Sequence, residues 1–411
     1  MGHPVFLIGQ ASEVGAVQGE LQRAVLVNRI ERTLQRAEES CGLDLLRARA
    51  DQFGGLLQEA TPHWLDEAHA LAQAASVDSW QLLALNCLPH AFWGEHYVPA
   101  PLNNQTTGEL VNAYEAQGYE PLLGGDCTTF FALGEATISG ETLFHKNRDE
   151  RDEVQCLYIK QIEGFNRFVG GGDIGNLGTA HLHTEDYWVG GNNTGSPVPP
   201  EEYEDCALHD GHVLRYLAER CTALDDIVPA IEELIANRWL GGGGAGFGMI
   251  LLFADAARGL IVEATARRLA HQWFEGDAMA VRANHFLLPE MQDYALPPLR
   301  NSVRRYERAT ELWLEQHGYA GISSCGEIAR DRAGAPDAIC RNPSDSGGGV
   351  TVSTSTATIS SHDDRRCATH FRNCHPSYTP AVILTALDRV SDSDLVSGAH
   401  NQQWRNYRGF V

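Results

Sequence analysis

Lysine is almost absent from this chain of 411 residues, in which Lys146 and Lys160 are the only two. The 31 basic residues face 54 acidic ones, leave a formal net charge of -23 and form no long run that could follow a phosphate backbone. No apolar stretch approaches the ~18 residues that a membrane-spanning helix needs, and no basic segment followed by an apolar run opens the chain. We therefore expect a soluble, cytoplasmic protein with no nucleic acid or membrane partner.

Signatures of metal and nucleotide sites are also missing or misplaced. The ten cysteines include no C-x-x-C pair, which argues against a structural zinc site. Residues 241–246 fit a G-x-G-x-x-G pattern, but they follow a predicted helix and open a predicted strand, the reverse of the dinucleotide fingerprint. No phosphate-loop motif is present, so we expect no cofactor. Two close histidine pairs, at 181/183 and 209/212, keep a metal-dependent hydrolase open as an alternative.

The first hundred residues have helical patterns. Apolar spacing predicts a helix from Glu20 to about Ala50, and Thr61-Pro62 predicts the start of a second. A capping box from Asp78 to Gln81 predicts a third. Residues 99–125, rich in Pro, Asn, Gln, Thr and Gly, predict a loop or linker.

Strand patterns dominate after residue 127. Runs at 128–133, 142–145 and 154–162 predict an antiparallel meander, and four more strands are predicted between residues 249 and 283. Helices are predicted from His212 to Arg220, from Thr222 to Asn237 and over 299–317, before a last strand at 350–360. Helices that precede and separate two sets of hairpin-connected strands predict an α+β fold with antiparallel sheets.

The chain is organised around Leu123 to Phe130, where two glycines and Asp126 lead into Cys127 at the start of a predicted strand. A thiol in this position can attack its own preceding carbonyl and become a new N-terminus, whose α-amine then serves as the base for the neighbouring side chain. The alternative is a buried structural thiol, because free cysteine is among the most buried residue types.

Three polar clusters at predicted strand ends favour the catalytic interpretation. The first, His145 to Asp149, ends the strand that we expect to pair with the Cys127 strand. The second contains Asn192 and Asn193, and the third contains Asn284 and His285. An Asn amide is a suitable donor to the oxyanion that forms when a thiol attacks an amide. Each cluster alone is more typical of a turn or a surface ion pair.

These residues resemble the autoproteolytic acyltransferase and hydrolase family that includes acyl-coenzyme A:6-aminopenicillanic acid acyltransferase and the carcinine-type hydrolases, which are cysteine-type N-terminal nucleophile hydrolases. Cys127-Thr128-Thr129 matches the family's Cys-Thr-Thr at the processing site, Asn147-Arg148-Asp149 its Asn-x-Asp, and Asn284-His285 its Asn-His segment. Asn301-Ser302 and Arg305 to Arg308 resemble the arginine-bearing helix that follows, and Pro62 to Asn86 the helical region ahead of the cysteine.

The resemblance implies a four-layer αββα sandwich of two antiparallel sheets and cleavage between Asp126 and Cys127. Residues 1–126 are then a mostly helical N-terminal segment and linker, released as a small chain, and residues 127–411 are the catalytic segment. The two chains stay together as one globular heterodimer. Asp126 stands where the family commonly has Gly, and its side chain restricts how far the scissile peptide can twist.

The resemblance also implies roles for individual residues. Cys127 is the nucleophile, Asp149 orients it and Asn284 donates to the oxyanion, with Asn192 or Asn193 as a second donor. Lys146 is expected near the thiol, where a cation favours the thiolate. The residues expected to contact substrate are Thr129, Arg148, Asn192, His285 and Arg341, the last as a charge partner.

The resulting hypothesis is an amidohydrolase that cleaves a small acylated amine or peptide-like amide through an acyl-Cys127 intermediate, with the Cys127 α-amine as general base. An acyltransferase that passes the acyl group from a thioester or amide donor to an amine is an alternative. The sequence gives no positive sign of an acyl-coenzyme A site. A further alternative is an unprocessed binding protein of the same fold, in which Asp126 blocks cleavage.

Overall fold

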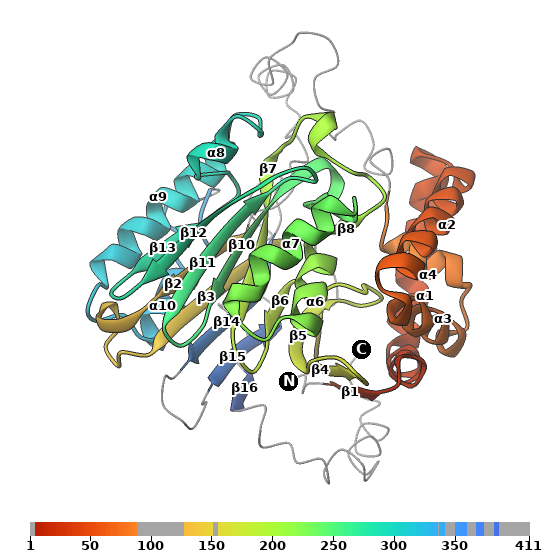
Figure 1. The fold of residues 1–411 in the computed structure, drawn as a ribbon, viewed down its shortest axis with the longest axis horizontal. Helices are drawn as coiled ribbons and strands as arrows, with labels where there is room; N and C mark the ends of the chain where they lie inside the picture. Colours follow the sequence, from red (N-terminus) through yellow and green to blue (C-terminus); the bar gives the residue numbers. More distant parts are fainter. Residues whose placement is uncertain are drawn as a thin grey trace.

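The computed structural model describes residues 5–88, 127–150, 155–335, 337–341, 350–359, 367–373 and 382–385. Asp126 and the predicted linker at 99–125 lie outside the described residues. Within the described residues, helices occur together with two multistranded sheets, as Figure 1 shows. This mixture of helices and sheets agrees with the predicted α+β class.

Four helices of the N-terminal segment pack together at one side of the molecule (Figure 1). They are α1 (Ala11–Ser40), α2 (Leu43–Ala60), α3 (Pro62–Ala75) and α4 (Ser79–Leu85). The single helix predicted from Glu20 to Ala50 is wrong, because Gly42 separates α1 from α2 with a φ of 83° that favours glycine. The predicted start of α3 at Thr61-Pro62 and the capping box of α4 are confirmed.

The larger sheet has eight strands in the order β1-β4-β5-β6-β7-β10-β11-β12. They are β1 (Val5–Gly9), β4 (Gln155–Ile162), β5 (Phe168–Asp173), β6 (His181–His183), β7 (Trp188–Pro197), β10 (Phe247–Ala254), β11 (Arg258–Ala264) and β12 (Leu269–Glu275). β1 pairs with β4 in parallel, and the other pairings in this sheet are antiparallel. The expectation of an antiparallel sheet is therefore corrected at one edge, where the N-terminal segment contributes a strand.

The smaller sheet has six antiparallel strands in the order β13-β2-β3-β14-β15-β16. They are β13 (Met279–Arg282), β2 (Thr128–Ala132), β3 (Thr142–Glu150), β14 (Val350–Ile359), β15 (Cys367–Asn373) and β16 (Val382–Thr385). The predicted meander is wrong in its third strand, because β4 belongs to the eight-stranded sheet and the second neighbour of β3 is β14. Strands that follow one another in the chain, such as β2 and β3, pair as hairpins. The paired strands β3 and β14, in contrast, are two hundred residues apart in sequence.

The remaining described elements lie between or after these strands. They are α6 (Asp210–Arg220), α7 (Ile227–Ala236), α8 (Pro289–Gln292), α9 (Arg300–Glu315), α10 (Ile322–Ala329) and a short parallel pair of β8 (Leu208–His209) and β9 (Leu240–Gly242). The helix predicted from Thr222 begins later, at Ile227, after a turn in which Asp226 accepts hydrogen bonds from the backbone N–H groups of Thr222 and Ala223.

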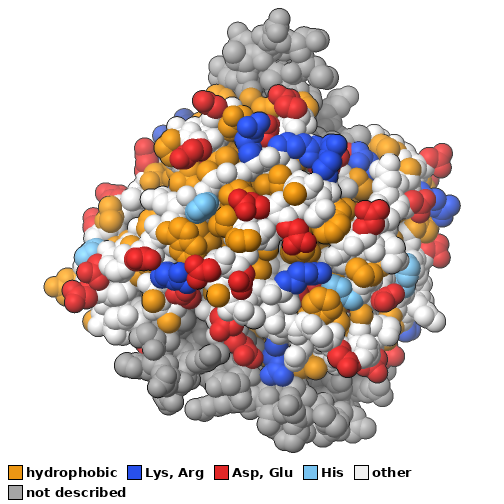
Figure 2. All heavy atoms as spheres, in the orientation of Figure 1, with side chains coloured by type: hydrophobic (Ala, Val, Ile, Leu, Met, Phe, Trp, Pro, Cys, Tyr) orange, Lys and Arg blue, Asp and Glu red, His pale blue; other side chains and the backbone are white. Residues whose placement is uncertain are grey.

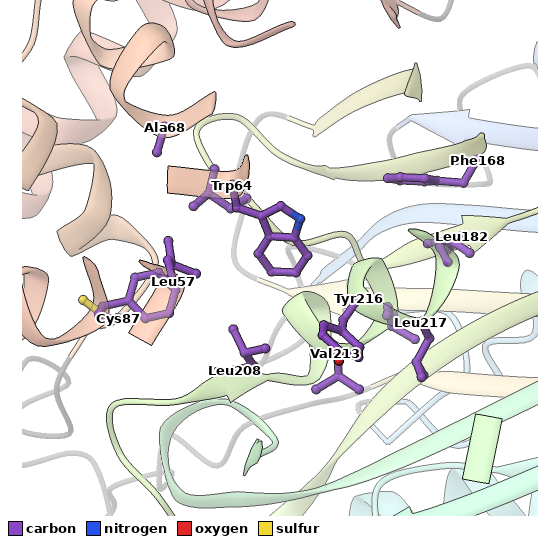
Figure 3. Close-up of a cluster of buried hydrophobic side chains, with 14 of the residues drawn as sticks. Leu57, Trp64, Ala68, Cys87, Phe168, Leu182, Leu208, Val213, Tyr216 and Leu217 are labelled. Carbon is purple, nitrogen blue, oxygen red and sulfur yellow. The ribbon is translucent and has the colours of Figure 1, made fainter. Parts of the chain in front are cut away.

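Clusters of buried apolar side chains hold these elements together. The largest joins α1–α4 and α6–α7 to the eight-stranded sheet, and Figure 3 shows part of it, where Trp64 of α3 lies on the side of α6, the helix that carries Val213 and Leu217. A second cluster, with Phe131 and Phe144, joins the two sheets. A third packs α9 and α10 on the six-stranded sheet. The first residues of β2 are consequently covered on both faces of their sheet.

The surface carries both signs of charge. Figure 2 shows Asp and Glu side chains interspersed with Lys and Arg and with apolar side chains on one face of the molecule. Among the helices that the structure describes, none is long and apolar enough to cross a membrane.

Candidate active site

Cys127 directly precedes β2 and is largely buried. Thr128 pairs with Asn147 of β3, and Thr129 pairs with Arg282 of β13. Because these strands are antiparallel, the end of β3 and the residues that follow β13 lie at the same sheet end as Cys127. The structure therefore brings together the cysteine and two of the three polar clusters that the sequence predicts.

Arg305 of α9 links the cysteine to the third cluster. It is fully buried, and its Nη1 donates to the backbone oxygen of Cys127 at 2.6 Å and to Thr128 Oγ1 at 3.3 Å. Its Nη2 donates to Asn284 Oδ1 at 2.8 Å. A guanidinium with several donors in a fixed plane can hold two acceptors at once, so one side chain fixes both the Cys127 backbone and the Asn284 amide.

The Asn284 amide is oriented from both ends. Its Oδ1 accepts from Arg305, and its Nδ2 donates to the backbone oxygen of Asn193 at 2.6 Å. Its own N–H donates to Ser302 Oγ at 2.8 Å. An Asn side chain has two N–H groups, and the contacts within the described part of the chain use one.

The turn that carries Asn284 is also fixed by its neighbours. Asn192 Nδ2 donates to the carbonyls of Arg282 and Ala283, at 3.2 and 2.9 Å. Glu263 of β11 accepts from the Arg282 side chain and from the backbone N–H groups of Leu287 and Leu288. Side chains from two strands therefore fix both ends of the turn.

Lys146 and Asn192 form a buried polar contact between the two sheets. Lys146 Nζ donates to the carbonyl of Gly191 at 2.5 Å and to Asn192 Oδ1 at 2.9 Å. Thr129 Oγ1 donates to the same Asn192 oxygen at 2.7 Å. β7 lies close to β2 and β3 at this point because Gly190 of β7 has no side chain. A Cβ at Gly190 would lie 3.0 Å from atoms of both Lys146 and Thr129. Asn192 is used in these contacts, whereas Asn193 offers its backbone oxygen to Asn284.

Asp149 and Arg341 meet through Thr351 of β14. Thr351 Oγ1 donates to Asp149 Oδ1 at 2.5 Å and accepts from the Arg341 N–H at 3.0 Å. All three residues are buried. The structure thus brings Asp149 and Arg341 to the same part of the sheet, although they are almost two hundred residues apart in sequence.

Arg148 lies in an ion pair with Asp173 at the end of β5. Its Nη1 donates to Asp173 Oδ1 at 2.7 Å, and its Nη2 to Asp173 Oδ2 at 3.2 Å. Burial raises the pKa of Asp173, but the Arg148 charge and its hydrogen bonds, with Arg29 and Gln155, outweigh burial and hold the pKa below its usual range.

His285 is neutral near pH 7. Burial, together with the Arg305 and Arg282 charges, lowers its pKa to about 4. Its Nδ1 lies 2.7 Å from Ser302 Oγ, and its ring packs edge-on against Tyr306, with centroids 5.5 Å apart. His285 therefore contributes no positive charge to the site.

A groove of about 190 Å³, lined by both polar and apolar side chains, runs beside β13, between β12 and α9. Arg282 and Tyr306 belong to its lining and are next to the Asn284 turn and Arg305 in the chain. The other large apolar side chains in the lining are Phe274, Met279, Val281, Trp313 and Leu314.

The two histidine pairs differ in position, because His181 lies near the end of β3, on the strand β6 that pairs with β7. Burial, then the Lys146, Arg148 and His145 charges, lowers the pKa of His181 well below its usual range. His183 lies near the Trp188 ring, and both ring nitrogens of His209 lie within hydrogen-bond distance of backbone carbonyls. Within the described residues, no group of three or more His, Cys, Asp or Glu side chains could hold a metal ion.

Arg305 and Ser302 are absent from the residues that the sequence predicts for the site, and Arg341 is predicted as the charge partner. The sequence contains a signal for both residues, because Ser302 and Arg305 are three residues apart and therefore lie on one face of the predicted helix. Only the pairing of α9 with β2 and the Asn284 turn identifies which arginine of that helix is buried against Cys127.

A comparison with known families agrees with the motifs. The family model described as acyl-coenzyme A:6-aminopenicillanic acid acyl-transferase matches residues 200–372. The matched segment contains Asn284 and Arg305 and begins after Cys127 and β3. This match supports the family resemblance indicated by the sequence, and with it an enzyme of the acyltransferase or N-terminal nucleophile hydrolase type. No curated protein matches the chain.

Proposed function

We propose that the chain is a self-processing N-terminal nucleophile amidohydrolase, with the four-layer αββα arrangement of that class, that opens the amide of a small acylated amine or peptide-like substrate. The observation that carries the proposal is the hydrogen-bonded series from the Cys127 backbone through Arg305 to the Asn284 amide. It joins a thiol at a strand start to an amide donor, the two groups that acyl transfer to a cysteine requires.

Maturation starts with the Cys127 thiol. Its sulfur adds to the Asp126 carbonyl carbon, the peptide C–N bond breaks, and the released nitrogen takes the proton to become the Cys127 α-amine. Water then hydrolyses the thioester, which frees the thiol and leaves a carboxylate on Asp126. The products are residues 1–126 and residues 127–411.

Turnover uses the same thiol. The α-amine, with an ordinary pKa of ~7.7 to 8.0, takes the thiol proton while the sulfur attacks the substrate carbonyl. Asn284 donates to the resulting oxyanion. The amine of the substrate then leaves with the proton that the α-amine took from the thiol, and water hydrolyses acyl-Cys127. In this mechanism Asp149 holds the α-amine or thiol, Lys146 supplies a nearby cation, and the groove beside β13 receives an apolar part of the substrate.

An acyltransferase differs only in the acceptor, since an amine replaces water in the second half of the reaction. Incubating cleaved protein with an acylated amine, with and without a second amine, separates the two. We expect the free acid to dominate; dominant formation of the new amide would replace the hydrolase assignment by the transferase.

Intact mass spectrometry tests the self-processing step. We expect the 411-residue chain, expressed without added protease, to give masses for residues 1–126 and 127–411. Cys127→Ala should stay at full length. Cys156→Ala is the matched control and should be cleaved normally, because burial raises the pKa of the Cys156 thiol to about 11 and keeps it protonated. An active preparation that stays at full length would remove the α-amine from the mechanism and favour an unprocessed protein.

A further inference from the structure

The N-terminal helices contact the sheet beside the candidate active site at the turn that follows β5. Arg29 of α1 donates from Nη1 to the carbonyl of Ile174 at 2.5 Å, and its Nη2 lies 3.6 Å from Asp173 Oδ2. Both charged side chains are mostly buried. A charge from the N-terminal segment is therefore paired directly with the last residue of β5.

The next residues of this turn are held equally closely. Asn86, at the end of α4, donates to the carbonyl of Gly175 at 3.0 Å and accepts from the Leu177 N–H at 2.7 Å. Gly175 has a φ of 81°, and a Cβ there would lie 2.5 Å from Leu26 of α1. The backbone after Asp173 is thus fixed against α1 and α4.

On its other side, Asp173 binds the end of β3. The two-point ion pair with Arg148 has the geometry in which carboxylate and guanidinium hold each other's orientation. Gln155 Nε2 also donates to Asp173, and its Oε1 accepts from Arg148 Nη1 at 2.7 Å. Asp173 therefore connects Arg29 of the N-terminal segment to Arg148 of the six-stranded sheet.

Arg148 is the neighbour of Cys127 across the two strands. Thr128 pairs with Asn147, so Cys127 and Arg148 are the next positions along β2 and β3. Lys146, two residues before Arg148, points between the sheets, and alternation places Arg148 on the same face. Opposite this point, the register of β14 shifts between Thr351 and Ser353. Pairing resumes beyond this bulge at Asp149 and Glu150, so the side-chain contacts of Arg148 add to an interrupted ladder at the point where it shifts.

We propose that Asp173 is a positioning residue that, held by Arg29 of the N-terminal segment, fixes Arg148 beside the Cys127 nucleophile. The inference rests on the proposed role of Cys127. It gives the helices before the cleavage site a part in catalysis, because their removal would release the Asp173 turn and with it the strand end that faces the thiol.

The test measures the reactivity of Cys127 without a substrate. Purified full-chain protein is treated with iodoacetamide at pH 7, and alkylation of the Cys127 peptide is followed by mass spectrometry in Asp173→Asn, Arg148→Gln and the double variant. We expect each single change to lower the alkylation rate about tenfold. The double variant should match Arg148→Gln within about twofold, because the effects of substituting two residues in contact do not add. Asp173→Glu should recover part of the rate.

Arginines of α1 provide the matched comparison. Arg29→Ala should change the rate in the same direction as Asp173→Asn, whereas Arg23→Ala should not, since Arg23 donates to the Ala74 carbonyl within the N-terminal segment. If Asp173→Asn does not fold, Arg29→Ala with Arg148→Gln completes the same cycle. A wild-type rate in Asp173→Asn, or additive losses in the double variant, would overturn the proposal. The cleavage state, read separately by intact mass, tells whether the self-processing function has failed instead.

Discussion

At the level of single residues, Arg305 has the most connected position near Cys127. It donates from α9 to the backbone of Cys127, which directly precedes β2, and to the side chain of Asn284, in the turn after β13. A buried guanidinium is costly unless its donors are used, so these contacts also explain why Arg305 can be fully buried.

We predict that Arg305→Lys folds but loses about a hundredfold or more in kcat/KM. An ammonium is a point charge and cannot reproduce the planar donation to two acceptors, so the Asn284 donor loses its orientation. The matched control is Arg304→Lys, because Arg304 is half exposed and pairs with Asp337 on the surface. Steady-state kinetics of both variants checks the prediction, and equal losses in the two would contradict it.

Single residues near Cys127 could be predicted from the sequence more fully than the contacts between them. The sequence predicts Cys127, Lys146, Asp149, Asn192, Asn193 and Asn284 as strand-end residues. This position is wrong for Lys146, which lies inside β3, and for Asn192 and Asn193, which lie inside β7, whereas Cys127 directly precedes β2 and Asn284 follows β13. Their catalytic roles stay predictions. The distinction between Asn192, which is used between the sheets, and Asn193, which accepts from Asn284, depends on contacts between strands that no local pattern encodes.

At the level of elements, a buried ionic network joins α3, β4 and α6. Lys160 Nζ lies 2.6 Å from one oxygen of Glu67, and Arg215 Nη2 lies 2.5 Å from the other. Arg215 also binds Glu219, which accepts from the Trp64 indole N–H. The network uses one of only two lysines in the chain and connects a residue of the N-terminal segment with two later elements.

We predict that Glu67→Gln lowers the free energy of unfolding by about 3 to 5 kcal/mol, because it leaves two buried cations with less negative charge than they require. Asp66→Asn, which changes the exposed neighbour on α3, should stay within about 0.5 kcal/mol of wild type. Urea unfolding at pH 7 measures both. Similar values for the two variants would mean that the network does not stabilise the contact between these elements.

Elements with local signals could be predicted, and elements that depend on distant partners could not. The caps of α3 and α4 and the hairpins from β10 to β12 follow from neighbouring residues. The assignment of β4 to the sheet that contains β1 cannot be predicted from neighbouring residues, because α1–α4 and the strands β2 and β3 lie between β1 and β4 in the chain. For the same reason, the parallel pairing of β1 with β4 at the edge of the larger sheet could not be predicted from the sequence.

At the level of the whole molecule, several buried groups make stability depend on pH in the same direction. Burial raises the pKa of Glu219, but the Arg215 charge and the contacts with His63 outweigh it and give about 2. Burial also raises the pKa values of Glu67 and Asp173, but the charges of their cation partners outweigh burial and lower both pKa values. Burial alone lowers the pKa of His183 to about 3, and burial with neighbouring cations does the same for His212.

The sign of the effect follows from these shifts. The carboxylates have folded pKa values below the ~4.3 of an unfolded Glu, so their contribution is complete above that pH and is lost as the pH falls toward 2. The two histidines bind protons in the unfolded chain below about pH 6.5 but stay neutral when folded until about pH 3, so they also favour unfolding as the pH falls through that range. Stability should therefore decline continuously below about pH 6.5.

For the cleaved protein, the same linkage predicts how its two chains separate. At pH 7 the pairing of β1 with β4 and the Glu67 network should keep residues 1–126 and 127–411 in one particle by size-exclusion chromatography. Near pH 3 the chains should separate, while uncleaved Cys127→Ala unfolds over the same range as a single chain. Glu219→Gln should weaken the dependence between about pH 5 and 2, and Asp225→Asn, which changes an exposed pair with Arg258, should leave it unchanged. Separation of the chains already at pH 7 would show that these contacts do not hold the cleaved molecule together.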